Sequence, residues 1–462
     1  MTSSITRLTR RIELAAPAQF VYDWHLRPGA FDRLAPPWQK VEVRDPGAGV
    51  AEGSRVVVRM RSGPLWKDWI AEHFGIVPGQ EFHDRQIRGP FAFWEHAHRV
   101  EPAGSDRCVL EDQIAYALPL GRLGGWLGGA LVRNELERLF NYRHAVTSQD
   151  IAALWTQRGN RRMRVLVSGS TGLVGTALIP LLTTAGHEVV RLVRSRAKTP
   201  SKEMVQWDPE ANYVDAAELE GLDAIVHLAG EPIAAGRWNP ERKRRIRESR
   251  IRGTRLLCET LSHLARPPQT LVCASAIGVY GDRGDEVLTE SSSPGSGFLA
   301  EVCRDWEAAC EPARQKGIRV ANLRMGVVLS PAGGALAKML TPFKMGVGGV
   351  IGSGRQFMSC VALDDLVGAI LHILVTPGLS GPINGVCPEP VSNREFTKTL
   401  GKVLGRPTIF PMPALAARLA FGEMADELLL ASARVQPGRL LEMGYQFRCP
   451  TVESALRHVL GR

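Results

Sequence analysis

The chain has 462 residues, a length that corresponds to about three domains of ordinary size. Hydrophobic residues make up 44% and charged residues 23% of it, which provides for packed cores and excludes wholesale disorder. Lys and Arg number 57 against 47 Asp and Glu, so the formal net charge is +10. A basic balance suits a nucleic acid, an anionic membrane surface or an anionic small molecule equally well, and charge alone selects none of them.

The cysteines and the N-terminus indicate a reducing compartment. None of the eight cysteines forms a C-x-x-C pair, and the nearest two, Cys303 and Cys310, are seven residues apart. This spacing fits neither a zinc knuckle nor a disulfide framework, so we expect buried thiols and no metal site. The polar N-terminus is not typical of a signal peptide, and no uncharged apolar run reaches the roughly 18 residues of a membrane span. We therefore expect a cytoplasmic protein without a membrane span.

Residues 1–156 read as an α+β domain. Thr6–Ala15 and Gly53–Arg61 are rich in β-branched residues and predict strands. Leucines recur at helical spacing over Leu123–Trp155, which predicts a long final helix. The polar, basic stretch 157–162 that follows has the composition of a linker.

Residues 163–378 alternate buried-strand patterns with helix-length segments. Strands are expected at Val165–Val167, Val189–Val193, Ala224–Leu228, Leu271–Ala274 and Val320–Leu323. Because strands separated by helices join through right-handed crossovers, the pattern predicts an α/β domain with a doubly wound parallel sheet. From residue 379 to 462 the pattern becomes helical and rich in loops, which predicts a small α-rich third domain.

Residues 164–175 carry the strongest functional signal. A buried strand runs into glycines at every third position, Gly169, Gly172 and Gly175, and then into a helix. The first glycine permits a tight turn, the second lets the backbone approach a pyrophosphate, and the third allows close packing of the helix. The helix N-terminus, with Thr171, Leu173 and Val174, offers free N–H groups to phosphate oxygens. An ordinary tight turn is the alternative, but the position between strand and helix favours dinucleotide binding.

The end of the second strand indicates which dinucleotide is bound. NAD-selecting domains usually place Asp or Glu there to bind the ribose hydroxyls, whereas this strand ends in Val193 and Arg194. A guanidinium group suits a 2′-phosphate, so NADP(H) is favoured over NAD(H). A solvated surface arginine remains the alternative in a chain of this basicity.

Several motifs give the chain a family resemblance. The glycine spacing, Leu228–Gly230 and Val279–Gly281 resemble extended short-chain dehydrogenases/reductases. Residues 163–460 as a whole look like the epimerase family branch of that superfamily. Its further motifs are Leu228–Ile233, Arg237–Trp238, Lys243, Ser249–Arg250, Gly346–Ser359, Asp364–Leu366, Asn384–Gly385, Pro388–Pro390, Phe396 and Gly422–Met424. The resemblance implies cofactor contacts from six residues, namely Val193, Leu228, Ala229, Gly230, Arg250 and Val328.

The usual catalytic pair of this superfamily is missing. Its members use a Tyr-x-x-x-Lys pair on a helix, yet residues 298–307 contain neither tyrosine nor lysine. The family's name therefore does not carry over as a mechanism, and the nearest candidates for catalysis are Ser275 and Tyr280, although the pattern around Tyr280 favours a packed loop aromatic. Ser275 lies five residues before the tyrosine, whereas in many relatives the serine lies four before it.

Other side chains near this region have ordinary structural interpretations, which are favoured over a catalytic role. Glu301 and Glu307 could be acid/base groups, but on an amphipathic helix one of them is more often part of a solvated face. Cys303 could be reactive if its pKa were depressed, but it is more often an inert buried thiol. Cys360 and Ala362 stand where family members tend to carry Trp and His, which removes the most plausible imidazole.

The N-terminal domain resembles the START-like, polyketide-cyclase-type helix-grip fold in its order of elements. The resemblance implies an apolar small-molecule ligand. Aromatic side chains would line such a pocket or simply fill the core; they are Trp66, Trp69, Phe91, Phe93 and Trp94.

Three functions follow from these patterns. The leading hypothesis is an NADP(H)-binding oxidoreductase or epimerase-like protein that acts on a hydrophobic small molecule. The second is a non-catalytic NADP(H)-dependent sensor or ligand carrier, because the cofactor motif is intact while the acid–base pair is absent. A nucleic-acid-binding protein is favoured only by charge, and the basic run 242–252 reads as a solvated helix, so we expect no nucleic-acid partner.

Overall fold

The computed structural model describes residues 5–62, 65–194 and 203–462. It divides into two compact units: residues 1–160 with 183–186 and Gly461, and residues 161–182 with 187–460 and Arg462. The division at Asn160 falls within the polar stretch 157–162.

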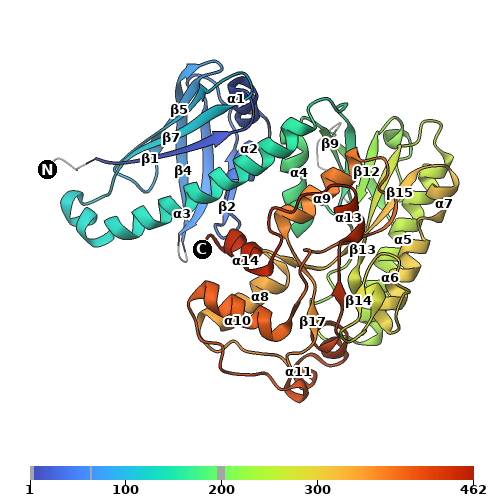
Figure 1. The fold of residues 1–462 in the computed structure, drawn as a ribbon. Helices are drawn as coiled ribbons and strands as arrows, with labels where there is room; N and C mark the ends of the chain where they lie inside the picture. Colours follow the sequence, from blue (N-terminus) through green and yellow to red (C-terminus); the bar gives the residue numbers. More distant parts are fainter. Residues whose placement is uncertain (1–4, 63–64, 195–202) are drawn as a thin grey trace. The chain divides into compact units, whose positions relative to one another are not determined.

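The first unit is a curved antiparallel sheet with one long helix (Figure 1). The seven strands lie in the order β1-β7-β6-β5-β4-β3-β2. Their bounds are β1 Thr6–Leu14, β2 Val41–Asp45, β3 Arg55–Ser62, β4 Leu65–Val77, β5 Glu81–Arg88, β6 Phe93–Pro102 and β7 Cys108–Ala117. Two short helices follow the first strand, α1 Ala18–Leu26 and α2 Ala30–Leu34. The strands predicted at Thr6–Ala15 and Gly53–Arg61 are confirmed in β1 and β3.

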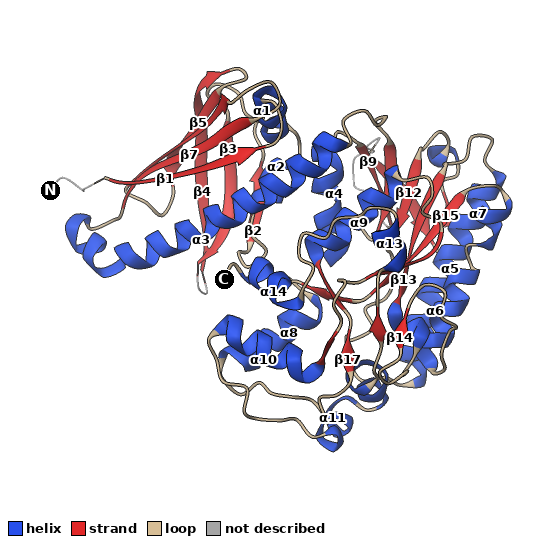
Figure 2. Cartoon of the chain, in the orientation of Figure 1, coloured by secondary structure: helices blue, strands red, loops and turns tan. Residues whose placement is uncertain are grey.

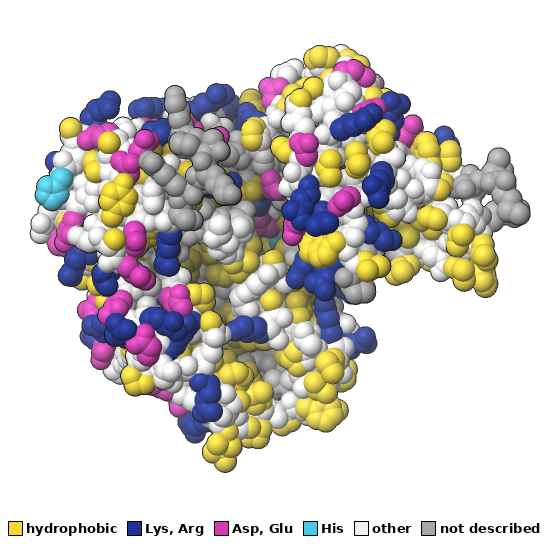
Figure 3. Space-filling view, turned by 180° about the vertical axis from the view of Figure 1, so that it is seen from behind, with side chains coloured by type: hydrophobic (Ala, Val, Ile, Leu, Met, Phe, Trp, Pro, Cys, Tyr) yellow, Lys and Arg dark blue, Asp and Glu magenta, His cyan; other side chains and the backbone are white. Residues whose placement is uncertain are grey.

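Helix α3, Gly121–Thr156, crosses one face of this sheet. Its Leu136 and Phe140 pack with Ile114 and Trp94 in a buried cluster, which is why the helix stays on the sheet. The first turns behave differently: Leu123 is 57% and Trp126 82% exposed. Hydrophobic side chains accordingly gather on the surface there and over α11 in Figure 3.

The second unit contains the parallel sheet that the sequence predicts. The order of its eight strands is β11-β10-β9-β8-β12-β13-β15-β19, and all neighbours are parallel except β10 and β11. The bounds are β8 Arg164–Ser168, β9 Glu188–Val193, β10 Met204–Asp208, β11 Tyr213–Val214, β12 Ala224–His227, β13 Thr270–Ala276, β15 Arg319–Met325 and β19 Gly381–Gly385. Because the order reverses beside β8, a crevice for ligands is expected at its carboxyl end.

Helices cover both faces of this sheet (Figure 2). They are α4 Leu173–Thr184 and α9 Leu363–Val375 on one face, and α5 Pro240–His263 and α6 Phe298–Ala308 on the other. The central strands are buried almost throughout, as a sheet covered on both faces requires. Asn239 caps α5 by accepting a hydrogen bond from the Arg242 backbone N–H at 2.7 Å.

The remaining elements are short, and they connect or flank the strands of this sheet. The strands are β14 Val287–Leu288, β16 Val327–Leu329, β17 Phe357–Met358, β18 Cys360–Ala362, β20 Val391–Ser392 and β21 Arg434–Val435. The helices are α7 Glu311–Gln315, α8 Gly334–Lys344, α10 Asn393–Leu404, α11 Ala414–Phe421, α12 Glu423–Ala425, α13 Gly438–Glu442 and α14 Val452–Leu460. Short 3₁₀ turns occupy Ala217–Leu219 and Ile277–Tyr280, and a π turn occupies Asp426–Leu430.

The predicted fold class is confirmed: a doubly wound parallel sheet, a helical C-terminal part and an antiparallel α+β domain before them. The domain boundaries themselves stay predictions, and β19, which follows the boundary drawn at residue 378, is the edge strand of the large sheet. Within the described ranges, no helix is both long and apolar enough to cross a membrane.

Candidate functional site

The glycine turn between β8 and α4 is built by two close backbone approaches. Gly169 has φ +65°, and a Cβ there would lie 2.9 Å from the Leu228 carbonyl carbon, at the end of β12. A Cβ on Gly175 would lie 2.3 Å from the Gly169 carbonyl oxygen, so α4 packs directly on the turn. At Gly172 a Cβ would meet only that same oxygen, at 3.2 Å. The first and third glycines are therefore required by the fold, whereas at the second a Cβ would be close to a single backbone oxygen.

Ser168 fastens the turn to the neighbouring strand. Its buried hydroxyl accepts hydrogen bonds from the N–H groups of Leu228 and Ala229 at 3.0 and 3.1 Å, and it lies 2.7 Å from His227 Nδ1. A hydroxyl that accepts two bonds has its own proton left to donate, which makes Nδ1 of His227 the acceptor. Burial lowers the pKa of His227 to about 4, so this imidazole is neutral near neutral pH.

The residues predicted to contact a cofactor lie at or near this edge of the sheet. Thr171 and Gly172 are exposed at the start of α4, while Leu173 and Val174 are partly buried in its first turn. Val193 ends β9 with Arg194 exposed just beyond it, next to β8 in the parallel register. Val328 lies on β16, whose following loop contacts Leu173 through Gly333 and Gly334. The residues thus follow the neighbouring strands β8 and β9, and Val328 lies on β16 of the small β16–β18 sheet.

Arg250 is a buried cation beside this edge. It is 8% exposed, and its Nη1 and Nη2 donate to the carbonyl oxygens of Ile246 and Glu231 at 2.9 and 3.1 Å. Its Cζ would lie 3.4 Å from a Cβ on Gly230 and lies 5.1 Å from the Trp306 ring centroid. Among the described residues, no carboxylate lies within ion-pair distance of it. Burial lowers the pKa of this guanidinium, which still stays cationic and suits a buried anionic ligand group.

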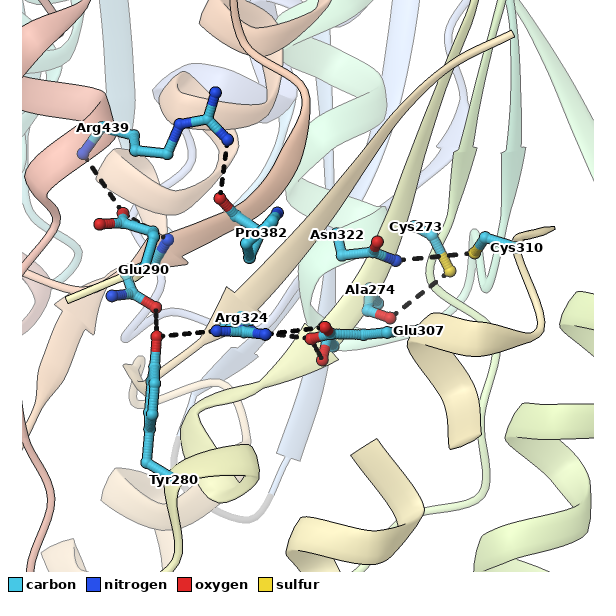
Figure 4. A network of polar contacts seen from close by, with 12 residues as sticks. Cys273, Ala274, Tyr280, Glu290, Glu307, Cys310, Asn322, Arg324, Pro382 and Arg439 are labelled. Atoms are coloured by element: carbon cyan, nitrogen blue, oxygen red, sulfur yellow. Dashed lines mark hydrogen bonds and ion pairs between the residues drawn. The ribbon is translucent and has the colours of Figure 1, made fainter. Parts of the chain in front are cut away.

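A buried polar network joins the two candidate catalytic residues, and Figure 4 labels Tyr280, Glu307 and Arg324 of it. Ser275 Oγ donates to Glu307 Oε1 at 2.7 Å, and Glu307 forms a two-point ion pair with Arg324, both contacts at 2.8 Å. Arg324 Nη1 donates to Tyr280 Oη at 3.0 Å, and Tyr280 donates to Asn384 Oδ1 at 2.8 Å. Ser275 and Tyr280 therefore lie at the two ends of one chain of charged hydrogen bonds.

Both hydroxyls are fully buried, at 0% exposure, and both already have acceptors. Burial raises the pKa of Tyr280, although the adjacent Arg324 opposes the shift. Their assignment as catalytic residues stays a prediction. The sequence left Glu307 open between an acid/base group and a residue of a solvated helix face; in the structure it is paired with Arg324 inside the unit. Glu307 lies four residues after Cys303, on the same face of the helix, and this spacing was the sequence signal that could have indicated an inward-facing Glu307.

The other side chains considered from sequence take structural positions. Glu301 is exposed and lies 4.0 Å from Arg247. Burial raises the pKa of Cys303 to about 11, which makes its thiol unreactive. All eight cysteines are buried and free. In the glycine-rich stretch 346–354, Gly348 packs on the Phe343 ring and Gly349 on the Phe410 backbone, so this segment is a tight connection.

Family models match three stretches of the chain. Residues 14–141 match polyketide cyclase/dehydrase and lipid transport proteins, and residues 165–383 match the NAD dependent epimerase/dehydratase family. Residues 412–459 match a domain of unknown function, DUF1731.

Individual relatives agree with these matches. An epimerase family protein of Mycobacterium bovis is 45% identical over 64% of this chain and 98% of its own length. A solved structure of a nucleoside-diphosphate sugar epimerase from Corynebacterium glutamicum has a TM-score of 0.81 at 35% identity and covers 98% of this chain and 90% of its own. The human epimerase family protein SDR39U1, crystallised with NADPH, has a TM-score of 0.59 at 36% identity, over 64% of this chain and 99% of its own.

Gly175→Ala tests the close packing of the turn. Because the new Cβ would lie 2.3 Å from a backbone oxygen, α4 must shift, at a cost of about 1–3 kcal/mol. The melting temperature of the second unit should fall by roughly 2–4 °C per kcal/mol, as measured by calorimetry without ligand. Gly172→Ala is the matched control and should change it little; equal effects of the two substitutions would contradict this account of the turn.

His227 should make the stability of the second unit depend on pH. Between its unfolded pKa near 6.5 and its folded pKa of about 4, the unfolded chain binds a proton that the folded chain does not, so the free energy of unfolding falls as pH falls. We expect a loss of about 2 kcal/mol between about pH 7 and about pH 5 from this group alone.

The test compares His227→Asn, which keeps an acceptor for Ser168 but does not titrate, with His263→Asn, which removes an exposed histidine of α5. Urea unfolding at both pH values, followed by tryptophan fluorescence, should show a smaller pH dependence only for His227→Asn. Identical pH dependence in the wild type and both variants would refute the assignment.

Proposed function

This chain belongs to the epimerase family, and from that premise we propose that its second unit binds NADP(H) and acts on a small molecule as an oxidoreductase or epimerase. The observation that supports this most directly is the turn of Gly169, Gly172 and Gly175, which leaves the N-terminus of α4 open to a pyrophosphate. The human relative of known structure was crystallised with NADPH.

The residues present fit such a cofactor. A side chain on Gly172 would stand beside the Gly169 carbonyl oxygen, where the pyrophosphate lies in this scheme. The N–H groups of Thr171, Leu173 and Val174 would bind the pyrophosphate oxygens, since the Gly172 N–H already donates to the Gly169 carbonyl oxygen at 2.9 Å. Arg194 would pair with the 2′-phosphate, since it stands where an NAD-selecting carboxylate is usual. Leu228, Ala229, Gly230 and Val328 would form the walls of the site, with Arg250 as a buried cation behind Gly230. When bound, the cofactor would supply or accept a hydride at its nicotinamide ring.

Proton transfer is the task left to the chain itself. Ser275 and Tyr280 are the candidate hydroxyls, and the Glu307–Arg324 ion pair holds both in place. For either hydroxyl to give a proton to a substrate, its present bond to Glu307 or Asn384 must be exchanged for one to the reacting oxygen. Glu307 and Arg324 would act as positioning residues, because they fix the orientation of the donors without contacting substrate.

A non-catalytic NADP(H)-dependent sensor or carrier is the second candidate. The observation that favours it is the complete burial of both hydroxyls, together with a helix α6 that offers neither tyrosine nor lysine. In either case the first unit, which matches a family of lipid transport and polyketide cyclase proteins, would bind an apolar small molecule and present it or report on it.

Arg194→Ala tests the choice of cofactor. Losing a charge-assisted contact to the 2′-phosphate should weaken NADPH binding about 10- to 100-fold and leave NADH binding nearly unchanged. Titrations followed by nicotinamide fluorescence measure both affinities. Arg191→Ala, which removes an exposed arginine of the same strand, is the matched control. Equal affinity of the wild type for NADPH and NADH would remove the proposed role of Arg194.

Ser275→Ala and Tyr280→Phe test the candidate donors. In a screen of carbonyl compounds monitored by NADPH oxidation, each should lower kcat about 10²- to 10⁴-fold if its hydroxyl is the proton donor. Tyr213→Phe, at an exposed tyrosine, should retain full turnover. Undiminished turnover in both variants would disprove the assignments, and no turnover with any compound, alongside ligand-dependent NADPH affinity, would favour the sensor.

A further inference from the structure

The inner face of the first unit's sheet carries a buried group of histidines and aspartates that the proposed function does not use. Asp84 on β5 lies opposite His96 on β6, and His98 on β6 lies opposite Asp112 on β7. His96, His98 and Asp112 are 3%, 9% and 3% exposed. Polar side chains at this density inside a small domain are costly to bury unless they bind something or one another.

We propose that Asp84, His96 and His98 bind one divalent transition-metal ion, of the zinc class, inside the first unit. Each of the three residues offers one ligand atom, and the three atoms lie within 4.8 Å of one another. Two imidazoles and one carboxylate are a common ligand set for zinc and for non-haem iron in proteins.

The distances within the group match a metal site. His96 Nδ1 lies 3.2 Å from Asp84 Oδ2. Two ligand atoms about 2.1 Å from a tetrahedral zinc ion stand about 3.3 Å apart, so an ion could bridge this pair with little movement of either side chain. His98 follows His96 on the same face of the strand, with ring centroids 3.9 Å apart, and supplies the third ligand.

The surrounding residues hold the ligands as metal sites require. Asp112 Oδ1 lies 3.0 Å from His96 Nε2, which leaves Nδ1 of His96 for the ion, and it also lies 2.7 Å from His98 Nδ1. Trp94 Nε1 donates to the second oxygen of Asp84 at 3.3 Å, and His144 Nε2 lies 2.6 Å from the second oxygen of Asp112. A carboxylate behind each metal-bound histidine is the usual arrangement that fixes ring orientation and tautomer.

Charge and ligand number indicate what else the ion would bind. Asp84 and Asp112 are negative, and Arg143, with its Nε buried, interacts with both. A divalent ion with neutral imidazoles would leave a single positive charge and an open coordination position, because only three protein ligands are present. We therefore expect that position to take hydroxide, or a carboxylate or enolate oxygen of a small molecule bound in this unit.

The full chain, stripped with a chelator, is the material for the test. Titration with Zn²⁺ in a calorimeter should give one equivalent of tight binding, and Co²⁺ should give the visible absorption of a low-coordinate histidine-ligated ion. Asp84→Asn and His98→Gln should each weaken binding more than about 10-fold, and Asp112→Asn about 10- to 100-fold. NADPH affinity of the variants should stay at the wild-type value, which separates this site from the second unit.

His83→Gln, which removes the histidine next to Asp84 in the chain, is the matched control and should bind Zn²⁺ as the wild type does. Circular dichroism of each variant checks that the first unit is folded, and the conservative Asp84→Asn is the variant that decides. The proposal is overturned if the wild type binds no Zn²⁺, or if binding persists unchanged in folded Asp84→Asn and His98→Gln. In that case the group is a hydrogen-bonded network only.

Discussion

The second unit depends on how closely the β8–α4 turn approaches the end of β12. Three separate parts of the backbone meet there: the Gly169 carbonyl, the Gly175 position on α4, and the Leu228–Ala229 peptide. No side chain fits between them, and the Ser168 hydroxyl fastens two of them together. This contact fixes the position of the turn at the edge where β9 and β12 also end. An open helix N-terminus at a reversal of strand order is a site for an anionic ligand.

A buried ion pair between α6 and β15 fixes the polar side chains beside strand β13. An isolated carboxylate or guanidinium would be costly to bury there, but Glu307 and Arg324 meet at two points and each satisfies a further hydroxyl. The network thereby holds Ser275 and Tyr280 in place where other members of the superfamily rely on a tyrosine and lysine of one helix. The same bonds that orient the hydroxyls also occupy them, which is why an enzyme and a sensor both remain consistent with this geometry.

The first unit carries aromatic side chains and charged side chains next to one another on its sheet. An aromatic cluster lies on its sheet, with the rings of Trp69, Trp94 and the neighbouring Phe91 in mutual contact at 4.9–5.8 Å between centroids. The group of Asp84, His96, His98 and Asp112 lies beside it, with His96 next to Trp94.

The sequence alone determined the fold class and the glycine turn, because both are written in local patterns. Buried parallel strands are continuous apolar runs, and a strand–glycine–helix turn needs Gly169 and Gly175 at fixed spacing. It also determined the long helix Leu123–Trp155, since helical periodicity needs no partner to be recognised. Arg194 could be placed at a strand end because the local apolar pattern of the strand stops at Val193.

Only the tertiary structure decided which distant residues meet. Glu307 looked like a solvated helix residue until β15 brought Arg324 to it. Asp84, His96, His98 and Asp112 follow no motif, because strand register rather than sequence spacing puts them side by side. Pairing of strands is a long-range property of the chain, and neither propensity nor periodicity encodes which side chains will lie opposite one another.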